Sequence, residues 1–98
     1  MAIMMVMEWD GVTPADYDRV RALVNWEGNV PPGALYHVAA YDGQKLRITD
    51  TWDSAEQFQA FVDQRLMAGV KQAGVNVEPK VEVLPVHAIF APGYTAKR

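Results

Sequence analysis

The sequence contains no cysteine, which excludes disulfides, iron–sulfur clusters, thiolate zinc sites and cysteine nucleophiles. Basic clusters are also missing, because the nine Lys and Arg residues are scattered and only Lys97 and Arg98 are adjacent. Nucleic-acid-binding proteins usually present a basic face. Since the formal net charge of this chain is -3, we expect no nucleic-acid partner.

A long hydrophobic run is missing as well. The apolar segment AIMMVM is short, has no basic leader and ends at Glu8, so it resembles neither a signal peptide nor a membrane span. We therefore expect a cytoplasmic protein without membrane contact. Ninety-eight residues, half of them hydrophobic, are enough for one domain with a core. We expect this domain to cover residues 1–98, with 93–98 as a flexible tail.

The first half of the chain begins with a strand and a helix. Residues 2–9 are almost wholly apolar and too few for a buried helix, which indicates a strand. Thr13 is a good helix N-cap, and Asp16 three residues later completes a pattern similar to a capping box. The helix would end at Asn25 or Gly28.

The segment ALYHVAAYDGQKLRITDTW predicts a β-hairpin. Asp42-Gly43 favours a two-residue type I′ turn, in which both central residues have positive φ. This register pairs His37 with Ile48 and places Asp50 diagonally across the ladder from His37. Both polar residues then share one face, which we expect to meet the helices because its other members are mostly apolar. These members are Leu35, Ala39, Tyr41, Gln44, Leu46, Ile48 and Trp52.

A second helix and a last strand complete the pattern. Ser54 caps the helix, with Gln57 three residues on, and Gly69 or Gly74 ends it. The last strand lies within 75–93, where a proline pushes it toward an edge or a bulge. The order β-α-β-β-α-β predicts the ferredoxin-like α+β fold, an antiparallel sheet with both helices on one face.

The opposite sheet face carries Tyr36, Val38 and Ala40, which are poor residues for contact with water. With helices for only one face, the sheet favours dimerisation through the other, and homodimers are the commonest oligomers.

The segment RITDTWDSAEQFQAF, with its Trp52, Asp53, Ser54 and Glu56, resembles the dimeric α/β-barrel superfamily. Within it, the chain is most similar to the antibiotic-biosynthesis-monooxygenase-like domains. The resemblance implies a homodimer whose sheets form a barrel, with a cavity in each protomer between sheet and helices. Members include cofactor-free oxygenases that act on aromatic polyketides, haem-degrading oxygenases and isomerases, so the resemblance implies a fold rather than one reaction.

One departure from the family pattern concerns haem. Haem-degrading members carry an iron-ligating histidine where this chain has Phe61, and an asparagine late in the first strand, where this chain reads VMEW. A phenylalanine cannot ligate iron, so we expect no haem by that route. His87 has no second ligand at the close spacing of metal motifs, and we expect neither a metal nor another cofactor.

His37 and Asp50 are the candidate catalytic residues, because a histidine beside a carboxylate on an apolar face suits a general base. The alternative is a structural hydrogen bond or salt bridge at the rim of the cavity. The candidate substrate-binding residues are Trp26, Trp52, Phe61 and Tyr17, whose rings suit a flat hydrophobic ligand. Tryptophans can also serve only as core. The loop NWEGNVPPG would lie over one mouth of the cavity, as a lid or as an ordinary loop.

Two functions fit these observations. The first is a cofactor-independent oxygenase or isomerase for a small hydrophobic molecule, possibly aromatic or polyketide-like, in which His37 removes a proton with help from Asp50. The second is a non-catalytic ligand-binding or structural homodimer of the same fold. A weaker third is a haem binder that uses His37 or His87, which a titration with haemin would test.

Overall fold

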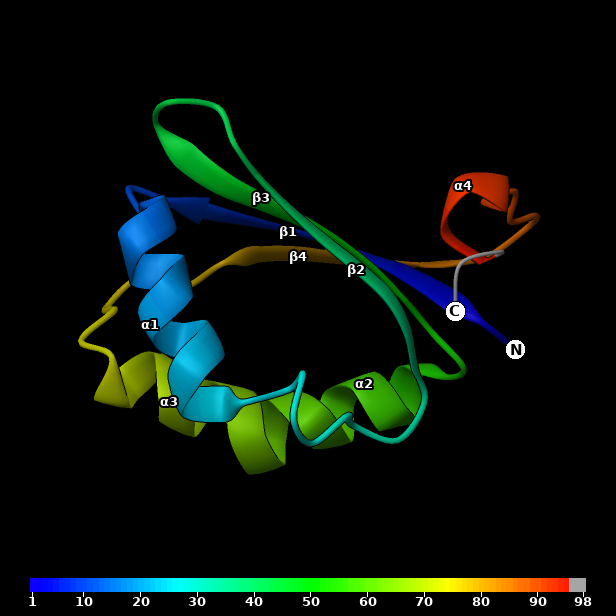
Figure 1. The fold of residues 1–98 in the computed structure, drawn as a ribbon, viewed down its shortest axis with the longest axis horizontal. Coiled ribbons are helices and arrows are strands. Elements are labelled where there is room, and N and C mark those ends of the chain that lie inside the picture. The colour runs from blue at the N-terminus through cyan, green and yellow to red at the C-terminus, as the bar shows by residue number, and fades with distance from the viewer. Residues whose placement is uncertain (96–98) are drawn as a thin grey trace.

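The computed structural model of the protein describes residues 1–95. Its four strands form one antiparallel sheet in the order β2-β3-β1-β4, and α1 and the α2–α3 helical segment lie on one side of it (Figure 1). This is the ferredoxin-like α+β fold that the sequence predicts. The elements are β1 (Ile3–Asp10), α1 (Pro14–Val24), β2 (Ala34–Tyr41), β3 (Lys45–Trp52), α2 (Ala55–Phe61), the π-helical η1 (Val62–Leu66), α3 (Met67–Gln72), β4 (Lys80–Pro85) and α4 (Pro92–Thr95).

Both ends of α1 follow from local side-chain chemistry. The Thr13 hydroxyl accepts a hydrogen bond from the Asp16 backbone N–H (3.2 Å), and the Asp16 carboxylate accepts one from the Thr13 N–H (3.0 Å). This is a complete capping box. At the other end Asn25 adopts the left-handed conformation (φ 56°), so the helix ends there rather than at Gly28.

The second helix is interrupted by a π-helical turn. It begins after the Ser54 cap as predicted, passes through η1, and ends before Gly74, which has a φ of 82°. The alternative end at Gly69 is wrong, because Gly69 is buried inside α3. A Cβ at Gly69 would lie 2.3 Å from Val24 Cγ2 of α1, so the glycine allows the two helices to approach closely.

The turn of the hairpin lies one residue later than predicted. The Asp42 backbone N–H donates to Lys45 O (3.3 Å), and the Asp42 carboxylate accepts from the backbone N–H groups of Gln44 and Lys45 (2.9 Å each). Such a bond from an aspartate to the backbone ahead of it favours a turn that starts at the aspartate. The two central turn residues are therefore Gly43 and Gln44. Only Gly43 has a positive φ, whereas a type I′ turn needs a positive φ at both positions, so the turn is not of type I′.

This shift changes the pairing but leaves His37, Asp50 and most of the other strand side chains on their predicted faces. His37 is paired directly with Asp50, not with Ile48. The register moved by two residues, and a strand has a side-chain period of two, so the face is preserved. Leu35 is the exception, because an irregularity between Ala34 and Tyr36 removes it from the ladder and leaves it 52% exposed.

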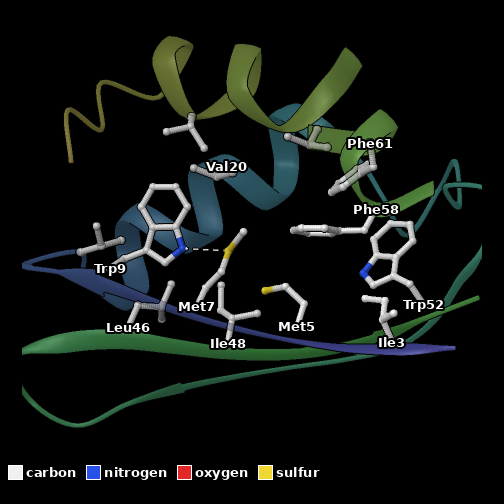
Figure 2. Close-up of a cluster of buried hydrophobic side chains, with 13 residues drawn as sticks. Ile3, Met5, Met7, Trp9, Val20, Leu46, Ile48, Trp52, Phe58 and Phe61 are labelled. Carbon is white, nitrogen blue, oxygen red and sulfur yellow. Dashed lines mark hydrogen bonds between the residues drawn. The ribbon is translucent and has the colours of Figure 1, made fainter. Parts of the chain in front are cut away.

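The core lies between the sheet and the helices. Alternate residues of β1 and β3 point into it, and Figure 2 shows Trp9 and Leu46 near one end and Trp52, Phe58 and Phe61 near the other. Met5 and Met7 lie between these two groups, and Met7 Sδ accepts a hydrogen bond from Trp9 Nε1 (3.3 Å).

The C-terminal part of the chain, from β4 onward, differs in part from the prediction. β4 is an edge strand, as its proline predicts, and it covers only Lys80–Pro85. Gly93–Thr95, part of the expected tail, belong to α4, and residues 96–98 lie outside the part that the structure describes. No helix among the described residues is long and apolar enough to cross a bilayer.

Candidate functional site

A cavity of about 280 Å³ lies inside the layer between sheet and helices, near the lower end of the range for small-molecule sites. Most of the residues around it are apolar core residues, so the core leaves room for a ligand. The polar or ionisable residues that line it are Tyr17, Glu27, Tyr36, His37 and Asp50.

Asp50 is a buried carboxylate on β3, only 6% exposed. A buried charge is stable only when its oxygens find donors. Asp50 Oδ1 lies 2.6 Å from His37 Nδ1, and Oδ2 accepts a hydrogen bond from Trp52 Nε1 (3.1 Å). Both oxygens are therefore occupied, and the direction of each hydrogen bond is fixed because a carboxylate only accepts.

His37 on β2 continues this chain toward α1. Its Nε2 lies 2.7 Å from the Tyr17 hydroxyl oxygen. Because Nδ1 donates to Asp50, Nε2 of the neutral ring is an acceptor, and Tyr17 must be the donor. Burial raises the pKa of Tyr17 above its ordinary value, and the nearby charge of Asp50 acts in the same direction, so the phenol stays protonated. The hydrogen bonds run in one direction, from Tyr17 through His37 to Asp50.

Aromatic rings form two walls of the cavity. Trp26 packs against Tyr17 (ring centroids 5.8 Å apart) and against His37 (5.3 Å). At the other wall Trp52 packs against Phe61 (5.4 Å). All four predicted substrate-binding residues thus line the same cavity as His37 and Asp50.

The loop between α1 and β2 borders the mouth of the cavity. Val30 lines the cavity although it is 65% exposed, and Leu35 does so from the start of β2. Glu27 also lies there and accepts two hydrogen bonds from Arg21 (2.6 and 2.7 Å). The predicted position of this loop over a mouth of the cavity therefore agrees with the lining residues.

Arg65, in the π-helical turn, supports the start of this loop. Its Nη2 donates to the backbone oxygens of Val24 (2.9 Å) and Asn25 (3.3 Å), and its guanidinium lies over the Phe61 ring. This role of Arg65 was not predicted from the sequence. The one available signal was a basic residue beside the inner face of the second helix.

His87 is exposed, outside any strand and not among the residues that line the cavity. Within residues 1–95 no three His, Cys, Asp or Glu side chains lie close enough together to hold a metal ion. The bond between Tyr17 and His37 was not predicted, because it depends on how α1 sits over β2.

Comparison with known proteins supports the fold. No model of a protein family matches the sequence, and no curated protein matches it. Among solved structures, SnoaB, a cofactor-independent oxygenase from Streptomyces nogalater, is 13% identical, with a TM-score of 0.68 over 90% of this chain and 95% of that one. The NE2512 protein of unknown function from Nitrosomonas europaea is 15% identical, with a TM-score of 0.72 over 93% and 94% of the two chains.

A third structure, from Chloroflexus aurantiacus J-10-fl, is provisionally assigned as an antibiotic biosynthesis monooxygenase. It is 20% identical, with a TM-score of 0.63 over 92% of this chain and 98% of that one. These likenesses confirm, at the level of the fold, the resemblance to antibiotic-biosynthesis-monooxygenase-like domains. They establish the fold and not the reaction, because one fold hosts several activities.

Proposed function

We propose that the protein is a cofactor-independent oxygenase or isomerase that acts on a small, hydrophobic, aromatic or polyketide-like molecule. The observation that carries this proposal is the hydrogen-bonded group of Tyr17, His37 and Asp50 in the wall of a cavity that is otherwise mostly apolar. The fold of SnoaB, itself a cofactor-independent oxygenase, supports the same class of activity.

Both reactions share a first step that this geometry suits. A C–H bond next to a carbonyl group breaks, its proton ends on the imidazole of His37, and its electron pair stays on the ligand as an enolate. Asp50 balances the positive charge that appears on the imidazole. In an oxygenase the enolate would then reduce dioxygen, whereas in an isomerase the proton would return at another carbon.

The shared step can be tested without knowing the natural substrate. Anthrone, a flat tricyclic ketone with acidic methylene protons, serves as the probe. In D₂O without oxygen, we expect the protein to accelerate exchange of these protons above the buffer rate. His37→Ala should lower the catalysed rate by a factor on the order of 100 or more, and His87→Ala, the same change at the exposed histidine, should leave it unchanged.

Admitting air separates the two reactions. An oxygenase would consume dioxygen as the methylene becomes a carbonyl group, with water as the second product, whereas an isomerase would exchange protons without oxygen uptake. Exchange at the buffer rate in the wild type, or equal rates in His37→Ala and His87→Ala, would contradict the proposal.

A non-catalytic ligand-binding dimer is the second candidate. It is favoured by the full set of partners around Asp50, since a satisfied buried carboxylate explains His37 and Trp52 without any reaction. This candidate predicts that anthrone binds in the cavity and that its protons exchange at the buffer rate in every variant.

In either case we propose a homodimer formed through the sheet face opposite α1, α2 and α3. Val38 and Leu84 lie on that face and are 44% and 40% exposed in the single chain. Tyr36 lies there too, in contact with the ring of Tyr94 from α4. Such a cluster of apolar side chains is typical of an association surface.

A further inference from the structure

Both nitrogens of the His37 ring are already engaged within the protein. Nδ1 is bonded to Asp50 and Nε2 to the Tyr17 hydroxyl. A ligand in the cavity could therefore form a hydrogen bond with a ring nitrogen of His37 only by displacing Asp50 or Tyr17. Tyr17 differs, because its hydroxyl uses its single proton toward His37 and makes no other hydrogen bond within residues 1–95. A phenolic oxygen can also accept hydrogen bonds.

We propose that the Tyr17 hydroxyl, rather than the His37 imidazole, is the group that meets the ligand, and that the ligand carries an acidic O–H group there, as a phenol or an enol does. This assignment rests on the proposed function, of which it names the catalytic residue in contact with the ligand. The ligand would donate a hydrogen bond to Tyr17 Oη while Tyr17 donates to His37 Nε2.

The proton path balances without any further reactant. As the O–H bond of the ligand breaks, its proton moves to Tyr17 Oη and its electron pair stays on the ligand oxygen. The original Tyr17 proton moves to His37 Nε2. Tyr17 ends neutral, the ligand is an anion, and His37 is a cation next to Asp50. A phenol that stayed ionised could not pass a proton on, and burial of Tyr17 favours its protonated form.

The surroundings hold Tyr17 in this position. It lies in the first turn of α1, directly after Asp16 of the capping box. Its ring is nearly parallel to the His37 ring (7°) with centroids 6.0 Å apart, and Trp26 packs against both rings. The charged groups that act on Tyr17 are Arg21, Glu27, Asp50 and Asp18.

A pair of ligands that differ in one hydroxyl tests this assignment. Para-nitrophenol carries an acidic O–H, and its anion has its own visible absorption band. Para-nitroanisole is the methyl ether and cannot donate. Binding of both would be measured by calorimetry for the wild type, for Tyr17→Phe and for Tyr41→Phe, the same change at an exposed tyrosine of β2 that does not line the cavity.

We expect the wild type and Tyr41→Phe to bind para-nitrophenol about five- to tenfold more tightly than para-nitroanisole, the effect of one hydrogen bond. The bound phenol should also show more of the anion band than the free phenol at the same pH. Tyr17→Phe should lose both effects and still bind para-nitroanisole as the wild type does, which shows that it is folded.

The outcomes separate this assignment from the proposed function. If Tyr17→Phe keeps the preference and the anion band, His37 meets the ligand itself and the assignment of Tyr17 is wrong. If the wild type binds both ligands equally, that assignment is also wrong, and the exchange of anthrone protons still decides the role of His37. If neither ligand binds the wild type, the cavity is not a site for such aromatic molecules, and both proposals fail.

Discussion

The buried Asp50 carboxylate depends on the indole of Trp52. Trp52 Nε1 donates to Oδ2 inside the core, where water cannot replace a lost donor. We expect Trp52→Phe to lower the free energy of unfolding by about 2–4 kcal/mol, from the lost hydrogen bond and the smaller ring. Urea denaturation at neutral pH measures this difference.

Trp26→Phe is the matched control for that prediction. Trp26 is only partly buried, and among residues 1–95 its indole donates no hydrogen bond, so the same change removes ring area alone. We expect the free energy of unfolding to fall by less than half as much as in Trp52→Phe. Equal losses in the two variants would show that the bond from Trp52 to Asp50 does not stabilise the fold.

At the level of residues, strand periodicity was enough to bring His37 and Asp50 together. The turn was misplaced, but the shift of two residues kept both side chains on one face. Strand periodicity could not predict the partner of His37 on α1. Helical spacing directs Tyr17 inward, but only the packing of α1 against β2 brings its hydroxyl to Nε2.

The two helical segments on this side of the sheet, α1 and α2–α3, approach each other closely at Gly69 of α3. An added methyl group there would collide with Val24 of α1, a buried residue with little room to move. Overpacking costs about 1–3 kcal/mol, while alanine gains up to about 1 kcal/mol over glycine in a helix. We expect Gly69→Ala to lower the free energy of unfolding by about 1–2 kcal/mol in urea denaturation.

Gly93→Ala provides the comparison, because a Cβ at Gly93 of α4 would meet no atom within 4 Å. We expect a change within about 0.5 kcal/mol for this variant. A Gly69→Ala protein more stable than the wild type would mean that α1 and α3 can separate at little cost.

At the level of elements, caps were easier to predict than interruptions. Thr13 and Ser54 start their helices as their sequence patterns indicate. The prediction of Gly69 as a possible helix end was wrong. In the sequence, a glycine that ends a helix cannot be distinguished from one that lets a neighbouring helix approach closely. The π-helical turn Val62–Leu66 leaves no local signal of its own.

Across the whole molecule, the sheet face opposite α1, α2 and α3 should hold two copies together. We expect Val38→Lys to weaken self-association by at least about tenfold, because it places a charge in an apolar contact. Analytical ultracentrifugation over a range of protein concentrations measures the effect. Val30→Lys is the control, since Val30 is more exposed but lies at the mouth of the cavity.

A wild-type protein that sediments as a monomer at all concentrations would contradict the dimer. If Val38→Lys and Val30→Lys weaken self-association equally, this choice of surface is wrong. Neither result would remove the cavity, because the residues described as lining it all belong to one chain.

We propose that the cavity beside His37 binds a flat apolar ligand, and the methionine methyl groups report on such binding directly. Met5 and Met7 line the cavity, whereas Met4 points to the opposite face of the sheet and Met67 is exposed on α3. In protein labelled with ¹³C at the methionine methyl groups, we expect anthrone to shift the Met5 and Met7 signals in a saturable way, through its ring currents. The Met4 and Met67 signals should stay in place. Saturable shifts at Met4 or Met67 alone, or no shift at Met5 and Met7, would show that the ligand does not bind in this cavity.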